Sequence, residues 1–171
     1  MAIEDVSQLL GEAKASSMTA EQILDELKAR FGEAVLQGGV KGNEVRVKVA
    51  PSKSLELCQA FYDLGFEYLN CLSGVDWIEE RELEVVYHIS SLRHKYKAVV
   101  KVRVPRQNPV VRSVTSIWKT ANWHEREAYD LFGIHFEGHP DLRRILTSED
   151  WVGHPLRKDY EDERLVRYHF P

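Results

Sequence analysis

Cysteine is scarce in this chain of 171 residues, which contains only Cys58 and Cys71. An ordinary iron–sulfur cluster takes four thiolates, so the chain cannot supply one by itself. One disulfide between the two cysteines is an alternative, although two cysteines in a chain of this size are typical of cytosolic proteins with free thiols. The sequence therefore predicts no thiolate metal cluster.

Long apolar runs are missing as well, since no stretch approaches the roughly 20 apolar residues that span a bilayer. The first residues, MAIEDVSQLLGEAKASS, have no basic head and no long apolar run, which argues against a signal peptide. The net charge of −4 does not favour nucleic acid or a polybasic membrane contact as the overall role. We expect a protein that is cytosolic, or that sits on a membrane complex without crossing the membrane.

Motifs for nucleotides and for catalytic nucleophiles are also absent. The glycines of QGGVKGN match neither a dinucleotide fingerprint nor a P-loop, and they fit a hairpin turn. No Gly-x-Ser-x-Gly occurs, and neither cysteine has a histidine close in sequence. A catalytic triad whose residues are brought together only by the fold is an alternative, but no residue pattern indicates one.

Helical and sheet-forming segments are present in alternation. TAEQILDELKARFG is expected to form a helix with a capping box from Thr19 and Gln22, and PSKSLELCQAFYDLGF is expected to form another. AVLQGGVKGNEVRVKVA predicts strand, glycine turn and strand, and EYLNCLSGVDWI predicts a further strand.

The pair ELEVVYHIS and YKAVVKVRV is the clearest predicted hairpin, because apolar residues recur at every second position in both arms. If the turn centres near Leu92–Arg93, Glu82 falls opposite Arg103 and Glu84 falls opposite Lys101. Such cross-strand charge pairs help to fix the register.

RQNPVVRS is then expected to be a loop, and VTSIWKTANWHEREAYDLFG to be helical, in one or two pieces, up to Gly133. The pattern predicts an α+β fold with a mostly antiparallel sheet and packed helices, followed by an extended irregular C-terminal arm. We divide the chain into an N-terminal lead-in (1–17), an α+β domain (18–133) and an extended partner-docking arm (134–171).

Charged, histidine and aromatic residues are densest in residues 121–151, ANWHEREAYDLFGIHFEGHPDLRRILTSEDW. The segment lacks an HExxH motif, but Glu127 and Asp130 lie three residues apart on the expected helix and could reach one cation. A metal-dependent hydrolase that uses these two carboxylates with His135 and His139 is therefore a distant alternative.

The competing interpretation pairs those carboxylates with Arg126 and with Arg143 or Arg144, because a planar guanidinium meets a carboxylate through two hydrogen bonds.

Residues 85–119 contain eight Lys or Arg and no Asp or Glu. A nucleic-acid-binding module that uses Lys95 to Lys119 is a further alternative. We favour a paired, solvated face or a protein-docking face, because several of these charges fall on the outer side of the hairpin, where Glu82 and Glu84 are available.

GHPDLRRIL and DWVGHPLRKDY both join a Gly-His-Pro turn to Leu and Arg. Large apolar side chains in such irregular segments would be exposed unless another surface covered them. Arg, Trp and Tyr are also the residues that most often anchor interfaces. These segments therefore indicate a docking element more than an active site.

A resemblance to a known family is carried by EREAYDLFGIHFEGHPDLRRIL, from Glu125 to Leu146, and by EDWVGHPLRKDY, from Glu149 to Tyr160. Together with YLNCLSGVDW, the hairpin and SVTSIWKTANW, these segments resemble the 30 kDa-type subunit, designated C, of bacterial NADH–quinone oxidoreductase (respiratory complex I). Its counterpart in cyanobacteria and plastids is the J subunit of NAD(P)H–quinone oxidoreductase. The similarity covers roughly residues 60–160, in order and without gaps.

The resemblance implies a non-catalytic subunit of the peripheral arm of a proton-translocating NADH–quinone oxidoreductase, at the cytoplasmic face of the cell membrane. It implies no catalytic, cofactor-binding or metal-binding residue on this chain, with FMN, iron–sulfur clusters and quinone on partner subunits. The partners would be the hydrogenase-large-subunit-like subunit of the quinone-reducing module and adjacent iron–sulfur subunits, with no nucleic acid and no direct membrane span. The equivalent subunit of a related membrane-bound hydrogenase or other quinone reductase is the alternative.

The residues expected at the partner interface belong either to a polar network that anchors the helix or to the arm itself. They are Glu125, Arg126, Glu127, Asp130, Phe132, His139, Pro140, Arg143, Arg144, Trp151, Arg157, Asp159 and Tyr160.

Overall fold

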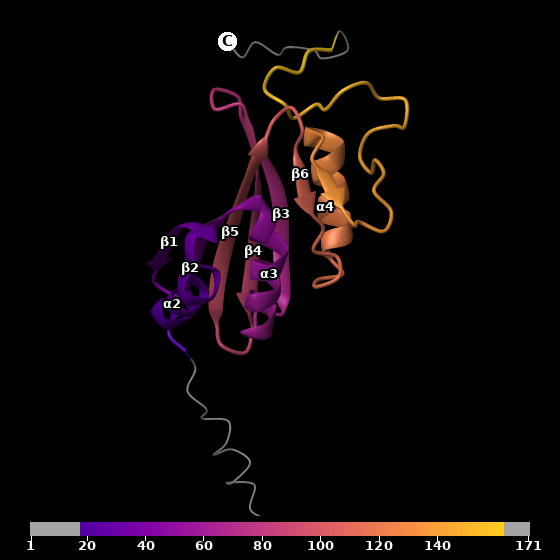
Figure 1. Cartoon of the computed structure of the whole chain (residues 1–171). Coiled ribbons are helices and arrows are strands. Elements are labelled where there is room, and N and C mark those ends of the chain that lie inside the picture. Colours follow the sequence, from indigo (N-terminus) through magenta and orange to yellow (C-terminus); the bar gives the residue numbers. More distant parts are fainter. Residues whose placement is uncertain (1–17, 163–171) are drawn as a thin grey trace, which may run out of the picture.

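A five-stranded sheet with the strand order β1-β2-β5-β4-β3 forms the centre of the molecule, and helices α2, α3 and α4 pack with it (Figure 1). The computed structural model describes residues 18–162, so the expected lead-in and the last residues of the expected arm lie outside the described part. In chain order the elements are α2 (Ala20–Phe31), β1 (Val35–Lys41), β2 (Glu44–Val49), α3 (Ser54–Asp63), β3 (Tyr68–Trp77), β4 (Glu82–Ser91), β5 (Tyr96–Pro105), β6 (Val110–Arg112), α4 (Ala121–Phe132) and β7 (His135–Glu137). Among residues 18–162, no helix is long and apolar enough to cross a membrane.

The predicted α+β fold with a mostly antiparallel sheet is confirmed. Strands β1–β2, β3–β4 and β4–β5 pair antiparallel, whereas β2 and β5 pair parallel. The chain passes through α3, β3 and β4 between these two parallel strands. The parallel pair was not predicted, because hydrophobic periodicity shows which side chains share a face but not which strands are neighbours.

The β4–β5 hairpin is confirmed, but its expected register was wrong by two residues. Glu84 lies opposite Arg103, and the turn comprises residues 92–95, where Lys95 has a left-handed backbone with φ 59°. The expected charge pairs nevertheless form, both on the diagonal, and Glu84 also pairs with Arg103 directly opposite it. Arg103 lies 3.0 Å from Glu82 and 3.1 Å from Glu84, and Lys101 lies 3.5 Å from Glu84.

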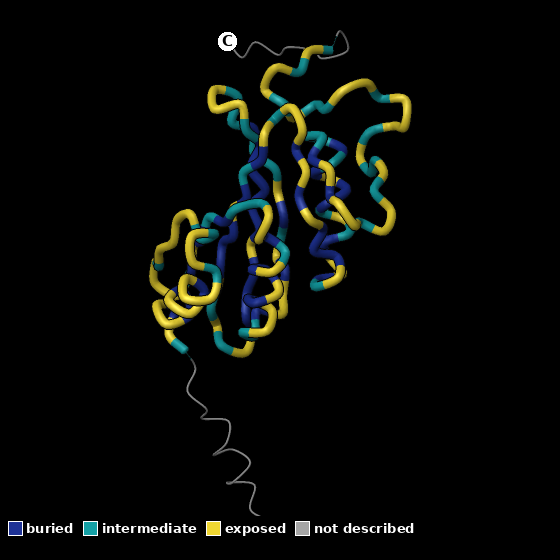
Figure 2. The backbone as a smooth tube through the Cα atoms, viewed as in Figure 1, coloured by how far each residue is buried: buried dark blue, intermediate teal, exposed yellow. Residues whose placement is uncertain are grey.

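The helices cover one face of the sheet, and within residues 18–162 the other face carries no helix. Thr19 and Gln22 form the predicted capping box at the start of α2. The apolar side of this helix packs on β1 and β2. Buried residues concentrate in the helices and central strands (Figure 2). The core joins side chains of α2 and α3 to alternate residues of the strands, among them Leu24, Leu27, Leu57, Phe61, Val45, Val47, Leu83, Val85, Tyr87, Ile89, Ala98, Val100 and Val102.

A second, two-stranded sheet connects α4 to the core. RQNPVVRS was expected to be a loop, but Val110–Arg112 forms β6, which pairs parallel with β7. This pairing buries Ile134 and Phe136 in the core, and α4 begins only at Ala121, after a series of turns. After Glu137 the described chain contains no further helix or strand, although it continues to follow α4 closely.

A candidate docking segment clamped to helix α4

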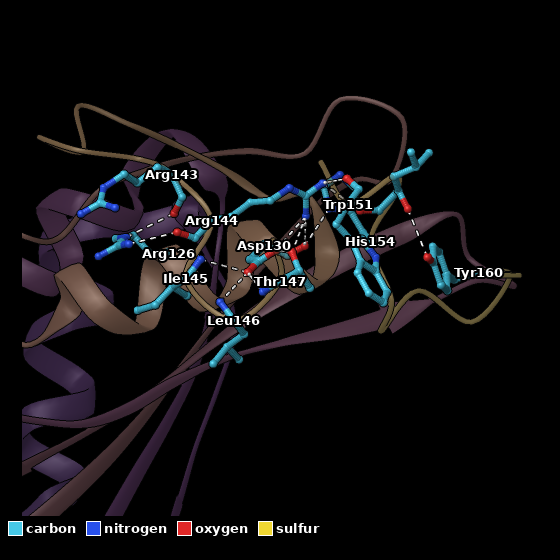
Figure 3. Close-up of polar contacts among 12 residues, drawn as sticks. Arg126, Asp130, Arg143, Arg144, Ile145, Leu146, Thr147, Trp151, His154 and Tyr160 are labelled. Carbon is cyan, nitrogen blue, oxygen red and sulfur yellow. Dashed lines mark hydrogen bonds and ion pairs between the residues drawn. The ribbon is translucent and has the colours of Figure 1, made fainter. Parts of the chain in front are cut away.

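Asp130, in the last turn of α4, organises the segment that follows the regular structure, residues 138–162, here called the irregular segment. One carboxylate oxygen, Oδ2, accepts hydrogen bonds from the backbone N–H groups of Ile145, Leu146 and Thr147 at 3.0, 2.8 and 2.9 Å. The other, Oδ1, accepts from the Thr147 hydroxyl and, at 2.7 Å, from Nη1 of Arg144 (Figure 3). A single buried carboxylate thus fixes the backbone of three consecutive residues.

The environment of Asp130 keeps its carboxyl group ionised. Burial alone would raise the pKa of Asp130, but the hydrogen bonds from Thr147 and from the backbone of Ile145 and Leu146 outweigh it. The pKa therefore lies well below the usual range of an aspartate. Donors from the irregular segment occupy both carboxylate oxygens, so Asp130 holds this segment in place.

The side chains that fasten the irregular segment to α4 and β3 are here called the clamp. Arg144 extends this clamp from Asp130 to the next turn of the segment. Its Nη1 donates to the Asp130 carboxylate, and its Nη2 donates to the carbonyl oxygens of Trp151 and Gly153, both at 3.0 Å. A guanidinium can do this because its donors form a rigid planar fork. Arg144 therefore ties α4 to two places in the chain, whereas the neighbouring Arg143 is exposed and pairs with Asp141.

Arg126 holds the near end of the segment through the backbone. It was expected to pair with a carboxylate, but its Nε and Nη2 donate to the carbonyl oxygens of Arg143 and Arg144 at 3.2 and 3.0 Å. His139 acts beside it: Nδ1 accepts from the backbone N–H of Asp141, so Nε2 carries the proton and donates to the Asn122 carbonyl at 3.2 Å. Burial lowers the pKa of His139, which agrees with a neutral ring.

The far end of the segment is fastened to the sheet by Asp76 at the end of β3. Asp76 accepts from Nε of Arg106 at 2.9 Å and from the backbone N–H of Lys158 at 2.8 Å. Burial would raise the pKa of Asp76, but these hydrogen bonds outweigh it and lower the pKa. Arg106 also donates from Nη1 to Asp159 at 3.0 Å, and Arg157 donates to the Phe132 carbonyl at 2.7 Å.

Two glycines allow the segment to approach this closely. A Cβ on Gly133 would lie 2.6 Å from Cδ2 of His154, and a Cβ on Gly153 would lie 2.7 Å from the Tyr160 ring. Both glycines also have positive φ angles, 73° and 82°, which other residues adopt at a cost. His154 Nδ1 in turn lies 2.9 Å from the Asp130 carbonyl oxygen.

Glu125 has a separate structural role on the other side of α4. Its side chain is fully buried and accepts from the Ser113 hydroxyl and from the Val114 N–H, both at 2.7 Å, which joins α4 to the chain after β6. Burial raises the pKa of Glu125 to about 7, and the two hydrogen bonds only partly oppose this shift. A protonated Glu125 can donate to Ser113, whose hydroxyl can then donate to Thr115 at 2.8 Å.

Three of the side chains that the segment turns outward are large and apolar, and they stand among exposed charged residues. Leu146, Val152 and Leu156 are 64%, 79% and 52% exposed, although their neighbours in the chain make the internal contacts described above. On α4 itself, Trp123 is 63% exposed and stacks beside Arg126, whose guanidinium carbon lies 5.4 Å from the ring centre. The internal contacts thus fix the backbone, and four large apolar side chains of the segment and of α4 remain exposed.

The structure places the residues expected at the interface in three settings. Glu125, Arg126 and Asp130 are buried, and Phe132 packs on β3, where Gly74 leaves room for its ring. The residues that remain exposed are Glu127, Pro140, Arg143 and Asp159, and those that are partly exposed are His139, Arg144, Trp151, Arg157 and Tyr160.

Asp76, Arg106, Thr147 and His154 were not predicted from the sequence as parts of the clamp. Asp76 and Arg106 gave no local signal, because their contacts come from Lys158 and Asp159 far along the chain. His154 repeats the Gly-His-Pro pattern of His139, and that repetition was the available signal.

The proposed metal ligands do not form a site. Glu127, Asp130, His135 and His139 do not come together, and residues 18–162 contain no group of three or more His, Cys, Asp or Glu side chains that could hold a metal ion. Asp130 is engaged by the irregular segment, and Glu127 and His135 occupy exposed positions.

An ordered irregular segment that exposes three large apolar side chains is a candidate contact surface for another protein. Residues 47–164 match the family described as "Respiratory-chain NADH dehydrogenase, 30 Kd subunit", and the chain belongs to this family. The resemblance inferred from the sequence is thereby confirmed.

Relatives within this family serve more than one kind of complex. The chain is 41% identical to the C subunit of F(420)H(2) dehydrogenase of Methanosarcina mazei, over 84% of this chain and 93% of that protein. It is 55% identical to the C subunit of NADH-quinone oxidoreductase of Chloroherpeton thalassium, over 62% of this chain but only 43% of that protein. A solved chain of the membrane-bound sulfane sulfur reductase, an archaeal respiratory membrane complex, superimposes with a TM-score of 0.72 at 26% identity, over 82% of this chain and 85% of that chain.

Proposed function

We propose that this chain is a non-catalytic subunit of the peripheral arm of a proton-translocating NADH–quinone oxidoreductase, where it supports assembly of the quinone-reducing module. Family membership supports this role. In this proposal FMN, the iron–sulfur clusters and quinone belong to partner subunits. The chain would lie at the cytoplasmic face of the cell membrane as a peripheral part of the complex.

The observation that carries the proposal is the construction of the irregular segment. Its internal contacts are made chiefly by the buried Asp130 and the partly exposed Arg144, while Leu146, Val152 and Leu156 remain exposed. Such exposed apolar groups on an ordered backbone favour a partner surface, because the ordering cost of docking is already met within the chain. The partner we propose is the hydrogenase-large-subunit-like subunit, together with adjacent iron–sulfur subunits.

Co-purification tests this proposal directly. The tagged chain is expressed in its native host, membranes are extracted with mild detergent, and the proteins that accompany it are identified. Cluster-bearing and quinone-module subunits in equal amounts are the expected result. A chain that is recovered alone would refute the proposal.

Arg144→Ala and Arg143→Ala form a matched pair for the same measurement. Arg144→Ala removes a partner of the fully buried Asp130, a loss that typically costs about 3–5 kcal/mol for a buried pair. Arg143→Ala removes only an exposed pair with Asp141, worth about 0–1 kcal/mol. We expect Arg144→Ala to lower the yield of assembled complex while Arg143→Ala leaves it unchanged, and equal yields would contradict the role of the clamp.

A second candidate is the equivalent subunit of a complex with another electron donor. The similarity to the F(420)H(2) dehydrogenase protein favours it, since that match covers 93% of the relative. The two candidates differ in the donor that the purified complex oxidises. Quinone reduction driven by NADH supports the first, whereas reduction driven only by reduced F420 supports the second.

A further inference from the structure

The face of the sheet that no described helix covers carries a basic hollow that the irregular segment does not use. Val86 of β4 and Val99 of β5 point to this face; they are 7% and 6% exposed but stand outside the core cluster. Residues of β1, β2, β4 and β5 enclose a hollow of about 570 Å³ there. Its lining includes the basic residues Arg46, Lys48 and Lys101 and one carboxylate, Glu44.

Charge on this face opposes that of the whole protein. Alternation along β2, β4 and β5 brings three carboxylates and five basic side chains to it, in a chain whose net charge is −4. The carboxylates are Glu44, Glu82 and Glu84, and the basic residues are Arg46, Lys48, Lys97, Lys101 and Arg103. Part of this basic run already stands out in the sequence, and the proposed function does not account for it.

The basic residues are only partly neutralised within the chain. Arg46 pairs with Glu44 at 2.6 Å, and Lys101 pairs with Glu84 at 3.5 Å. Lys48 lies directly opposite Lys101 in the β2–β5 register, and within residues 18–162 it has no carboxylate at ion-pair distance. Lys48 therefore carries a positive charge beside Lys101 that no described carboxylate neutralises, and an anion over the hollow would neutralise it.

We propose that this face binds an acidic segment of another subunit of the complex, with carboxylates over Lys48 and Lys101 and apolar atoms over Val86 and Val99. The hollow supplies the space, the unpaired lysine supplies the charge, and the two valines supply an apolar floor. This inference rests on the proposed function, because it requires the chain to be part of a complex. It concerns a surface separate from the irregular segment.

Gly39 allows the hollow to be altered without disturbing the chain. This residue lies opposite Arg46 on β1, and a Cβ added there would meet no atom within 4 Å. Gly38, its neighbour, faces the other way, where a Cβ would lie 2.8 Å from Leu24. A side chain at residue 39 therefore projects into the hollow and not into the core.

Site-specific photocrosslinking in the native complex tests the inference. Gln37, an exposed neutral residue that lines the hollow, is replaced by p-benzoylphenylalanine in the full chain, and Gln59 on α3 is replaced in the same way as a control. After irradiation of purified complex, the crosslinked peptides are sequenced by mass spectrometry. We expect position 37, but not position 59, to capture one Asp- and Glu-rich peptide of another subunit.

Charge variants make the test specific. Lys48→Glu should lower the yield of this crosslink about fivefold through lost attraction and new repulsion, whereas Lys48→Arg should not. Gly39→Glu should act like Lys48→Glu, with Gly39→Gln as its control, in case the lysine variant impairs folding. Capture of a neutral or basic peptide, of nucleic acid or of a second copy, or a yield that ignores charge, would overturn the inference.

The same samples separate this inference from the proposed function. If the chain migrates with the complex on a native gel but position 37 captures nothing, the docking surface is wrong and the proposed function stands. If the chain is absent from the complex, the proposed function is wrong and the inference fails with it.

Discussion

Asp130→Asn is the most informative single substitution for the irregular segment. The amide keeps the shape of the carboxyl group but replaces one accepting oxygen by an NH₂ donor. That donor must then face either Arg144 or the backbone N–H groups of residues 145–147, all of which are donors themselves. At least one side of the clamp therefore loses its acceptor.

The expected magnitude follows from the charge and burial of Asp130. Hydrogen bonds to charged groups contribute about 1.5–3 kcal/mol each, and a buried ion pair that loses one partner typically costs about 3–5 kcal/mol. We take about 3 kcal/mol as the loss of local stability, because Arg144 remains partly exposed and keeps its bonds to Trp151 and Gly153. That loss corresponds to roughly a hundredfold change in a local opening equilibrium.

Amide hydrogen exchange measures this opening at the residues concerned. In Asp130→Asn the backbone N–H groups of Ile145, Leu146 and Thr147 should exchange roughly a hundredfold faster, because they lose their acceptor. The amides of β4 and β5 should be unaffected, since the core does not depend on this carboxylate. Asp141→Asn, at an exposed carboxylate, is the control. Unchanged exchange at residues 145–147, or equal acceleration in the core strands, would refute the reasoning.

Three further predictions concern the attachment of α4 and of the segment. The pKa of Glu125 is raised to about 7 in the folded state, so its protonation stabilises the folded protein fully below about pH 4.5. The free energy of unfolding should fall by about 3 kcal/mol as pH rises from there through 7. Urea unfolding at each pH measures this fall, and Glu125→Gln should remove it. Gly74→Ala places a Cβ 2.6 Å from the Phe132 ring and should destabilise the protein by about 1–3 kcal/mol in the same assay; an unchanged stability would contradict the tight packing of this ring on β3. Arg106→Gln removes the link to Asp159 and should accelerate trypsin cleavage after Lys158; an unchanged rate would contradict the far-end attachment.

The sheet was predictable to the extent that its information is local. Alternation in β4 and β5 predicted the buried face, and Leu83, Val85 and Tyr87 are buried as expected. The register depended on the turn, where the left-handed Lys95 closes a loop that periodicity does not reveal. Strand neighbours depended on the path of the whole chain, so the parallel β2–β5 pair could not be predicted from separate segments.

The residues of the clamp were easier to predict than their partners. Asp130 and Arg144 could be chosen because charged residues beside a helix end and a Gly-His-Pro turn indicate a constrained site. Their pairing was one of the expected alternatives, and it forms at 2.7 Å. The three N–H groups bound by Asp130 could not be predicted, since almost every residue offers such a donor and sequence does not distinguish them.

The same physics explains how a segment without helix or strand can keep a definite shape. Its backbone groups are satisfied by side chains from regular elements, Asp130 and Arg126 on α4 and Asp76 on β3, instead of by a repeating ladder. A ladder would impose one period on the segment, whereas separate side-chain contacts let each residue point in its own direction. The outward positions of Leu146 and Val152 are therefore set by side chains that bind the adjacent backbone from inside. If the segment docks as proposed, substitutions inside the clamp should weaken docking without altering the exposed apolar side chains, which distinguishes this construction from a flexible tail that folds on its partner.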